Sequence, residues 1–590
     1  DVIVGIIDGG FQYNHINFYD TEGKNLRIKR VWNQNQSGTP PTGYYYGTEY
    51  TNAEEIIAAK QDYAASHATH VTGIAAGAYK GNEYYGIAPD ADLVFVSYNV
   101  SDNSSSNTSI TDGIKYIYDY AESVGKPCVI NMSLGYHIGP HDGTSTFDRI
   151  CDELQGEGRL LVGASGNEAE YNIHATKTLK KGDTNMKSLV EFVSNWYLYG
   201  SMTSTVDIWG DAEKQLSARV FVYDILNKKE VYSSESFSTT TSTSKKISNP
   251  TGADGNIYIS TATNPYNKKG NITIDLNLSS FDNRNYYIGF EISGPEETTI
   301  NAWTDAYMSW LSNFGNSEFT NGDNNSTMGE IGGTGKRIIT VGAYTSCNYI
   351  DHKNSSMWNN SGQTLNQLVS FSSLGPTADG RMKPDITAPG SMLISSFNSS
   401  TSSNRNGEDY NYVVKQENVN TVNYYYGSME GTSMATPVVT GVLATWLQAN
   451  PKLTPEQVRE ILSNTATTDS YTGNIAGVGN NRWGYGKINA YDGLVYCLNH
   501  SGIEQIGTPT RPMVYPNPAT DICYFLLQND DKNVNVSIYT LNGTEIYSRY
   551  MGNINAGEQN QLDLSDLAAG IYFIHITGDK TNMTTKLTVK

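Results

Sequence analysis

Two short apolar runs that each end at a polar side chain constrain the fold of this chain more than any other feature. Residues 2–7 are apolar and mostly β-branched, and Asp8 and two glycines follow them. Residues 160–164 repeat the pattern ahead of Asn167. Runs of this kind predict strands buried on both faces of a parallel sheet. Because catalytic and ligand-binding side chains gather at the carboxyl ends of such strands, Asp8 and Asn167 are candidate functional residues.

A serine stands where a turn of small residues leads into an apolar helix. Residues 431–437 read Gly-Thr-Ser-Met-Ala-Thr-Pro, and an apolar run continues to Leu447. The glycine lets the backbone bend tightly, and the N-terminal end of the helix favours negative charge that develops beside Ser433. A serine is a weak nucleophile by itself, so this one needs a base and an orienting carboxylate.

A histidine at the start of a second helix is the candidate base. Residues 66–77 carry many small side chains, which predicts a closely packed helix that holds His67 at its start. His70 shares the same helix face, but no nearby Cys or Glu completes a zinc site, and we assign no metal-binding residue. Each candidate has an ordinary explanation taken alone, such as a helix cap or a turn, whereas the combination favours catalysis.

Four motifs resemble those of the subtilisin-like serine proteases (subtilases, peptidase family S8). They are Ile-Ile-Asp-Gly-Gly around Asp8, His-Ala-Thr-His-Val-Thr-Gly from His67, Ser-Gly-Asn ending at Asn167, and Gly-Thr-Ser-Met-Ala-Thr-Pro around Ser433. The order Asp, His, Ser along the chain also matches that family. The sequence departs from the family pattern at Ala68, where glycine usually follows the histidine. The extra methyl group removes no chemical group from the site.

The resemblance implies a role for each of the four residues. Ser433 attacks the scissile carbonyl, and His67 takes its proton and later gives it to the leaving amine. Asp8 fixes the tautomer of His67 and stabilises the imidazolium, while Asn167 donates a hydrogen bond to the tetrahedral oxyanion. The implied activity is that of a secreted serine endopeptidase, which needs no cofactor.

A further segment resembles the subtilase strand that pairs with the peptide substrate. Residues 129–135 read Val-Ile-Asn-Met-Ser-Leu-Gly, an apolar strand that leads into a turn. An extended peptide can add to such a strand edge, and a neighbouring pocket then selects its side chain. Tyr136 follows where the family often has a small residue. The resemblance implies two pocket walls, formed by Ser133, Leu134 and Gly135 and by Ala164, Ser165 and Gly166.

Composition limits the partners of this chain. Its 590 residues are 38% apolar and 17% charged, which is typical of a large globular protein. The net charge of −20 argues against nucleic acid or an anionic membrane as a partner, and no run of about eighteen apolar residues predicts a membrane span. The resemblance to the subtilases implies a polypeptide substrate as the partner. The five cysteines lack Cys-x-x-Cys spacing, and we expect buried free thiols.

The chain is longer between Asn167 and residue 337 than a simple subtilase requires. Six alternating, β-branched runs lie between residues 188 and 292, separated by polar turns, and predict an antiparallel sandwich. The arrangement resembles the Csp-type branch of subtilases, which carries an inserted jelly roll. We therefore predict an α/β, parallel-sheet catalytic domain in residues 1–185 and 311–500, interrupted by an all-β jelly roll at residues 186–310. This insert either braces the catalytic domain or a propeptide, or binds glycan.

The end of the chain predicts a separate, small β-sandwich. After a linker at residues 501–512, residues 513–590 contain alternating runs and an Asn542-Gly543 hairpin turn. The unit resembles the C-terminal sorting domain of type IX secretion in Bacteroidota, including its last five residues, Lys-Leu-Thr-Val-Lys. The resemblance implies a secreted or cell-surface protein.

Three further expectations complete the sequence analysis. An inactive subtilase scaffold that binds a surface glycan or protein through its insert is the alternative to the protease. Subtilases are commonly made with an inhibitory propeptide, so we expect that one preceded Asp1 and was removed. They also often hold structural calcium, but no acid-rich loop assigns a calcium site here. Near residue 454, Thr-Pro-Glu-Gln predicts the start of a capped helix that runs to about residue 466.

Overall fold

The computed structural model describes residues 2–99, 107–193, 201–247, 254–279, 281–282, 284–305, 308–500, 513–527, 529–540, 544–556 and 558–590. The chain divides into two compact units, Asp1–Asn499 and His500–Lys590, and each is described by itself.

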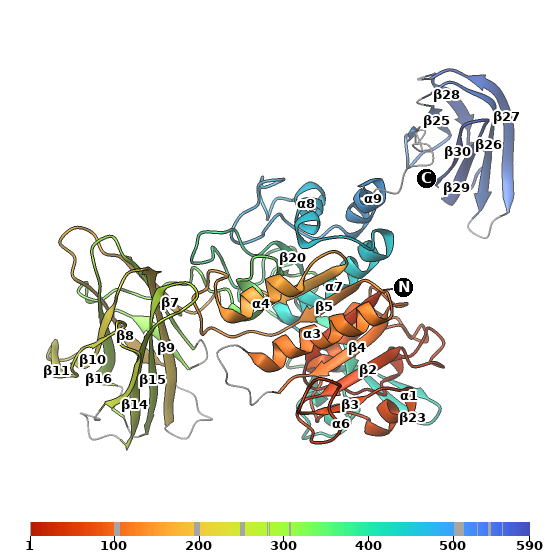
Figure 1. Ribbon diagram of the computed structural model, residues 1–590. Helices are drawn as coiled ribbons and strands as arrows, with labels where there is room; N and C mark the ends of the chain where they lie inside the picture. Colours follow the sequence, from red (N-terminus) through yellow and green to blue (C-terminus); the bar gives the residue numbers. More distant parts are fainter. Residues whose placement is uncertain are drawn as a thin grey trace. The chain divides into compact units, whose positions relative to one another are not determined.

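An eight-stranded sheet forms the centre of the first unit (Figure 1). Its strand order is β20-β19-β6-β5-β1-β4-β2-β3, and every neighbouring pair is parallel except β2 and β3. The strands are β1 (Ile3–Asp8), β2 (Ile28–Asn33), β3 (Thr48–Tyr50), β4 (Asp92–Ser97), β5 (Cys128–Met132), β6 (Arg159–Ala164), β19 (Ile339–Tyr344) and β20 (Ile386–Pro389). The predicted α/β fold with a parallel core is confirmed.

Both faces of this sheet are buried, as the apolar strand sequences predict. All six residues of β1 are buried, and their side chains alternate between two hydrophobic clusters. Val4 and Ile6 pack in the cluster that contains α2 (His67–Ala76) and α7 (Thr432–Ala449). Ile3 and Ile7 pack in the cluster that contains α3 (Thr108–Ser123) and α4 (Thr146–Leu154). Helices therefore cover each face of the sheet, and β1 runs between them.

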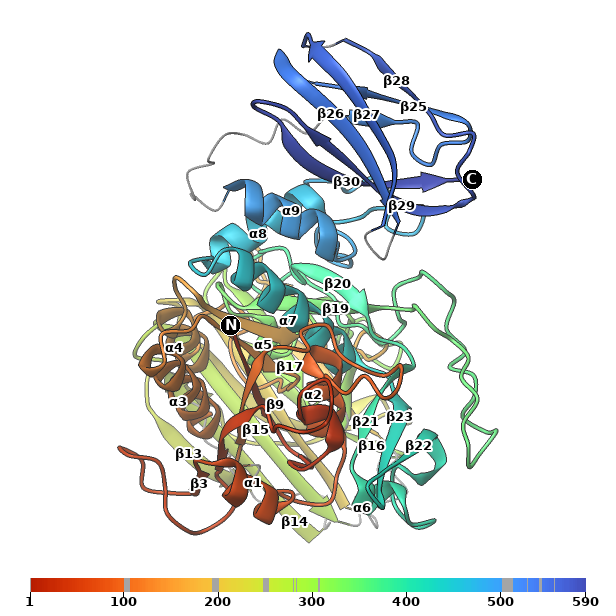
Figure 2. The same ribbon diagram turned by 90° about the vertical axis from the view of Figure 1, so that its right-hand side faces the viewer.

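The helix α7 packs closely against its surroundings, and 13 of its 18 residues are buried. It contacts α2 and the strands β5, β6, β19 and β20, and Figure 2 shows it next to β19 and β20. A three-stranded antiparallel sheet leads into it, made of β21 (Leu393–Phe397), β22 (Val413–Val419) and β23 (Val422–Met429). The remaining helices are α1 (Ala53–Ala59), α5 (Glu330–Gly333), α6 (Ser399–Ser402), α8 (Pro455–Thr465) and α9 (Ala490–His500), with 3-10 turns at Ile16–Phe18 and Tyr410–Tyr412.

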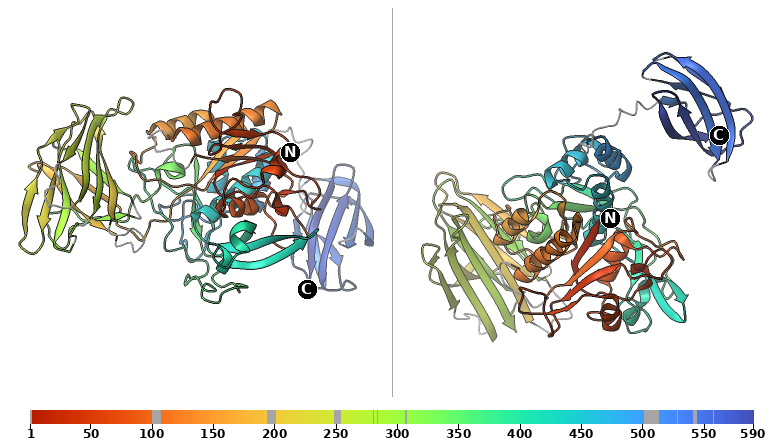
Figure 3. Two further views of the ribbon diagram at one scale, coloured as in Figure 1. Left: turned by 90° about the horizontal axis from the view of Figure 1, so that it is seen from below. Right: turned by 45° about the vertical axis from the view of Figure 1, so that its right-hand side comes forward.

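An antiparallel sandwich is inserted between β6 and β19, and Figure 3 shows its yellow-green strands gathered together. The order β11-β10-β16-β8-β18 forms one sheet, in which β12 also pairs with β10, and β13-β14-β15-β9-β17-β7 forms the other. The strands are β7 (His174–Thr178), β8 (Asn185–Phe192), β9 (Ser201–Ala212), β10 (Ser217–Asp224), β11 (Lys229–Ser233), β12 (Phe237–Ser238), β13 (Thr243–Ile247), β14 (Asp254–Thr263), β15 (Lys269–Ser279), β16 (Tyr286–Ser293), β17 (Thr299–Thr304) and β18 (Ser309–Ser312).

Side chains from both sheets fill one core inside this sandwich. Along β15 buried and more exposed positions alternate, and Ile272 and Ile274 point into the same cluster as Val220 and Ile288 of the opposite sheet. Strand β7 and the end of β18 lie outside the predicted range of 186–310. Only the first two residues of β7 are buried, and the other three are polar. Its sequence therefore lacks the alternating apolar pattern by which a strand is recognised.

The second unit consists of two small antiparallel sheets, β24-β25-β28 and β27-β26-β29-β30. Their strands are β24 (Met513–Tyr515), β25 (Ile522–Leu526), β26 (Asp531–Thr540), β27 (Glu545–Ile554), β28 (Asn560–Asp563), β29 (Gly570–Thr577) and β30 (Asn582–Val589). Phe525 and Leu562 of the first sheet share a core with Val536 and Ile574 of the second. The predicted turn at Asn542 and Gly543 lies outside the described residues.

Two further observations concern the chain as a whole. Within the described ranges, no helix is both long and apolar enough to cross a membrane. All five cysteines are free thiols; four are buried, as expected, whereas Cys347 is half-buried.

Candidate active site

Three elements bring Asp8, His67 and Ser433 to one place. Asp8 is the last residue of β1, His67 the first residue of α2, and Ser433 the second residue of α7. The two helices pack against each other over the same face of the sheet. Residues separated by more than 350 positions in the sequence therefore meet at the carboxyl end of β1, the edge at which the sequence predicts a site.

The carboxylate of Asp8 holds the imidazole of His67. Asp8 is only 3% exposed, and its Oδ1 lies 2.7 Å from His67 Nδ1 and accepts a hydrogen bond from Gly9 N at 2.7 Å. An ionised carboxylate only accepts hydrogen bonds, so Nδ1 carries the proton and Nε2 is left as the basic nitrogen.

Charge and burial oppose each other at His67. Burial disfavours the imidazolium and lowers its pKa, but the charge of Asp8 and the hydrogen bond to it outweigh burial and raise the pKa of His67 above its usual value. The His67 side chain remains 38% exposed, which gives a substrate access to Nε2. The pair is thus built to accept a proton and to stabilise the cation that results.

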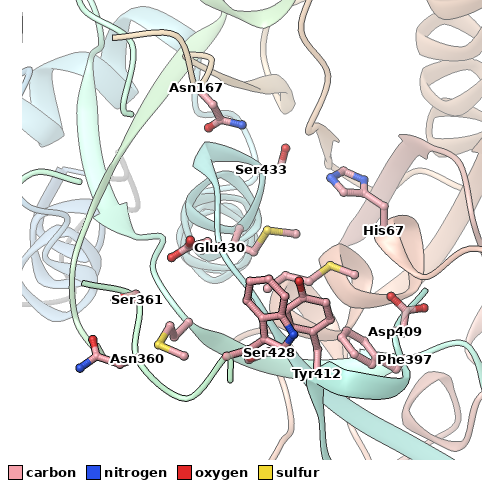
Figure 4. Close-up of a pocket in the computed structure, with 14 residues that line it drawn as sticks. His67, Asn167, Asn360, Ser361, Phe397, Asp409, Tyr412, Ser428, Glu430 and Ser433 are labelled. Atoms are coloured by element: carbon pink, nitrogen blue, oxygen red, sulfur yellow. The ribbon is translucent and has the colours of Figure 1, made fainter. Parts of the chain in front are cut away.

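Ser433 faces His67 across a cavity of about 550 Å³ that both residues line. Figure 4 shows the imidazole of His67 directed toward the side of the cavity on which Ser433 lies. In this structure Ser433 Oγ donates to the carbonyl oxygen of Ser133 at 3.3 Å, a long hydrogen bond. Because Ser433 lies in the first turn of α7, its own N–H group has no partner within the helix and adds to the positive end of the dipole.

The amide of Asn167 is oriented by the residue before the serine. Its Oδ1 accepts hydrogen bonds from Thr432 N at 2.9 Å and Thr432 Oγ1 at 3.0 Å. A backbone N–H can only donate, so these contacts identify the oxygen of the amide and leave Nδ2 on the other side. Figure 4 shows this nitrogen on the side of Ser433. Asn167 therefore presents a hydrogen-bond donor beside the serine hydroxyl.

A second cavity, of about 240 Å³, lies on another side of Ser433. Of the six residues predicted to bind substrate, Leu134, Gly135, Ala164 and Gly166 line it. Ser133 and Ser165 are not among the described residues that line either cavity. Ser165 is fully buried, and its backbone bonds to Val341 and Gly329 instead.

The family follows from the match over this whole region. Residues 1–486, which include all four candidate residues, match the subtilase family. The chain belongs to the subtilase family. Residues 513–590 match the secretion system C-terminal sorting domain, so this subtilase carries the type IX secretion tail of Bacteroidota and is secreted or held at the cell surface. Both resemblances predicted from the sequence are confirmed.

Relatives of this subtilase are similar over limited stretches. Serine protease AprX of Bacillus subtilis is 36% identical over 158 residues, which are 27% of this chain and 30% of AprX. Subtilisin of Bacillus sp. (strain TA39) is 34% identical over 126 residues, which are 21% of this chain and 28% of that protein. The chain thus spans less than a third of the length of either relative.

A solved structure shares the fold over a much larger part. The CspB protease of Clostridium perfringens has a TM-score of 0.61 and 20% sequence identity, and the match covers 85% of this chain and 95% of that chain. The two chains therefore share an architecture that includes both the subtilase fold and additional antiparallel sheets.

Hydrogen bonds that the sequence motifs do not reveal tie the serine helix to the sheet. The hydroxyl of Ser133 donates to the carbonyl oxygen of Ser433 at 2.7 Å and accepts from Asn131 Nδ2 at 2.9 Å. Asn131 Oδ1 in turn accepts from Thr440 Oγ1 at 2.9 Å. All these groups are buried or nearly so. This series of hydrogen bonds connects β5 to α7 and fixes the position of Ser433 relative to the sheet. Ser133 therefore positions the serine helix through its side chain.

The second cavity is also lined by residues that the motifs did not identify. Glu168 follows Asn167 directly, and its Oε2 accepts from Ser373 Oγ at 2.9 Å and lies 3.4 Å from His137 Nε2. Thr205 and Asp305 line the same cavity but belong to the inserted sandwich. The sequence could have indicated Glu168 as a site residue, because it directly follows Asn167. No local pattern in the sequence places Thr205 or Asp305 near Ser433.

Proposed function

We propose that this subtilase is a serine endopeptidase that hydrolyses polypeptides outside the cell. The observation that supports it most directly is the 2.7 Å contact between the buried carboxylate of Asp8 and His67 Nδ1, which leaves Nε2 directed at the cavity shared with Ser433 and Asn167. This set supplies a nucleophile, a base, a group that orients the base and an oxyanion donor.

The proposed reaction proceeds through an acyl-enzyme. Ser433 Oγ attacks the scissile carbonyl carbon while His67 Nε2 takes its proton, and the carbonyl oxygen becomes an oxyanion bound by Asn167 Nδ2. Collapse of this intermediate breaks the C–N bond, and the leaving amine receives the proton from His67. Water then attacks the ester with His67 again as the base, which releases the acid and restores Ser433. Asp8 stays ionised throughout and stabilises the imidazolium.

Two cavities that meet at Ser433 favour cleavage within chains. Ser433 and Asn167 line both the larger and the smaller cavity, so a peptide bond at Ser433 has room for side chains on either side. In the larger cavity, Trp358 lies against Tyr412 with ring centroids 5.5 Å apart and offers an apolar surface. An endopeptidase needs both spaces, whereas an enzyme that trims chain ends needs one of them closed.

The alternative is an inactive scaffold that binds glycan or protein through the sandwich. The arrangement of Asp8, His67, Asn167 and Ser433 at one cavity favours hydrolysis over this alternative, because a scaffold has no need of an oriented base.

Reaction with a fluorophosphonate tests the proposed function. We expect a single covalent label per chain, located on Ser433 by mass spectrometry, together with hydrolysis of casein. The matched control is Ser463→Ala, which should leave labelling unchanged. It removes a hydroxyl on α8 that donates to the carbonyl oxygen of Glu460 and accepts from Asn464 Nδ2 at 3.5 Å. A chain that hydrolyses nothing and takes no label refutes the proposal.

Replacement of Asn167 by alanine is expected to lower kcat by about 10²–10³ with little change in KM, because the donor acts on charge that exists only in the transition state. Asn167→Asp separates this role from a structural one. Aspartate keeps an oxygen that accepts from Thr432 but replaces the donor by a second oxygen, so its loss of kcat should be at least as large. Normal turnover in Asn167→Asp, measured with a fluorogenic peptide, would contradict the oxyanion role.

A further inference from the structure

The inserted sandwich contributes to the smaller cavity beside Ser433. Thr205 in β9 and Asp305, directly after β17, line this cavity together with Ser433 and Asn167. Asp305 N donates to the carbonyl oxygen of Thr205 at 3.2 Å, so the two residues form one edge. A part of the fold that is separate from the catalytic sheet thus reaches the reaction centre.

The sandwich is attached to the wall of the same cavity. Gly139, which directly follows the lining residues Tyr136 to Ile138, donates its N–H to Asp207 Oδ2 of β9 at 2.8 Å. The ring of His141 stacks on Trp303 of β17 with centroids 4.1 Å apart. Trp303 Nε1 donates to the carbonyl oxygen of Ser326 at 3.0 Å. Asp305 lies two residues beyond this anchored tryptophan, so its position relative to Ser433 is set by packing.

Carboxylates dominate the charge of this cavity. Glu168 and Asp305 are among the described residues that line it, and none of those is a Lys or Arg. A third acid, Asp275, accepts from Thr205 Oγ1 at 2.9 Å at the same edge. The pKa of Tyr136, another lining residue, is raised by burial and further by Asp207, Asp305 and Asp275. The negative field therefore extends into the cavity itself.

The two lining acids differ in what they already contact. Glu168 is buried, accepts from Ser373 and lies beside His137, the histidine of the cavity. The carboxylate of Glu168 is therefore already engaged by contacts within the protein. Asp305 is an exposed residue that lines the cavity, so its carboxylate is accessible to a cation that enters.

We propose that this cavity selects lysine or arginine at the residue whose carbonyl Ser433 attacks, and that Asp305 of the inserted sandwich determines this preference. The inference rests on the proposed endopeptidase function. A cationic side chain gains Coulomb energy from Asp305 with support from Glu168, an aliphatic one gains none, and an acidic one is repelled. The cavity volume of about 240 Å³ suits one extended side chain.

Fluorogenic peptides that differ only at this position, with Lys, Arg, Leu or Glu, test the inference on the full chain. We expect kcat/KM to be highest for Lys and Arg and lowest for Glu. Asp305→Asn keeps the shape of the side chain and removes its charge, so kcat/KM for Lys and Arg should fall about tenfold while that for Leu stays within about twofold. Asp305→Lys should favour Glu over Lys. Added salt should reduce the preference of the native chain.

Glu235→Gln is the matched control, because it removes one exposed charge of the sandwich that does not line the cavity. It should leave every kcat/KM unchanged, and the rate of fluorophosphonate labelling should be equal in all variants, which excludes a general folding defect. Equal hydrolysis of the Lys and Leu peptides, or a preference that Asp305→Asn does not change, overturns this inference and leaves the endopeptidase intact. Failure to hydrolyse any peptide, with no labelling of Ser433, overturns both.

Discussion

Replacement of Ser433 by alanine is expected to lower kcat by about 10⁶-fold, a magnitude known from removal of the nucleophile in triads of this family. The proposed mechanism has no route to the acyl-enzyme without Oγ, because His67 would then have only water to activate. Substrate binding should persist, since neither cavity loses more than one small group. We therefore expect the loss in kcat and only a small change in KM.

The substitution removes few contacts, so a loss of activity can be attributed to the missing nucleophile and not to a folding defect. Ser433 Oγ makes one long hydrogen bond, to the carbonyl of Ser133, and a single such bond contributes on the order of 1 kcal/mol to stability. Unfolding by heat should thus be almost unchanged. A double variant, Ser433→Ala with His67→Ala, should be no slower than Ser433→Ala alone, because the residues act as one unit. Appreciable turnover in Ser433→Ala would require a different nucleophile.

Local signals in the sequence predicted the elements that carry the candidate residues. The strand β1 was recognisable because its apolar run has the length and composition of a strand buried on both faces, and it is buried at every position. The helix predicted over 454–466 forms as α8, with Thr454 accepting from Gln457 N as its cap. Asp8, His67 and Ser433 each stand at an end of such an element, so predicting the elements also predicts where these side chains meet. Their catalytic roles stay a proposal.

Contacts between distant segments were not predictable in this way. The bond between Asn131 and Thr440 joins residues 309 positions apart, and neither residue differs locally from an ordinary strand or helix residue. Asp305 lies two residues beyond Trp303, whose packing against His141 helps to hold it at the cavity. Strand β7 pairs with β17, its Ala175 opposite Ala302, although its own sequence has no clear strand pattern. The Asn131–Thr440 bond, the position of Asp305 and the pairing of β7 all depend on tertiary packing. No short stretch of the sequence reveals such packing.

Replacement of Asp8 is expected to have the second largest effect, a loss of about 10⁴ in kcat for Asp8→Ala. Two contributions are involved, orientation of His67 and stabilisation of the imidazolium, and Asp8→Asn separates them. Asp8 Oδ1 contacts both Gly9 N and His67 Nδ1. The Gly9 N–H favours oxygen over NH₂ at this position, so asparagine can keep His67 in its tautomer while losing the charge.

The pH dependence of kcat/KM reports the electrostatic contribution directly. The charge of Asp8 and its hydrogen bond raise the pKa of His67, and only unprotonated Nε2 can accept the serine proton. Removing the carboxylate therefore lowers this pKa and moves the acid limb of the profile to lower pH, in Asp8→Asn as well as in Asp8→Ala. Asp119→Asn, which removes an exposed charge on α3, should leave the limb in place. An acid limb that does not move in Asp8→Asn would mean that His67 is not the group whose protonation limits the reaction, and the base would have to be sought elsewhere in the cavity.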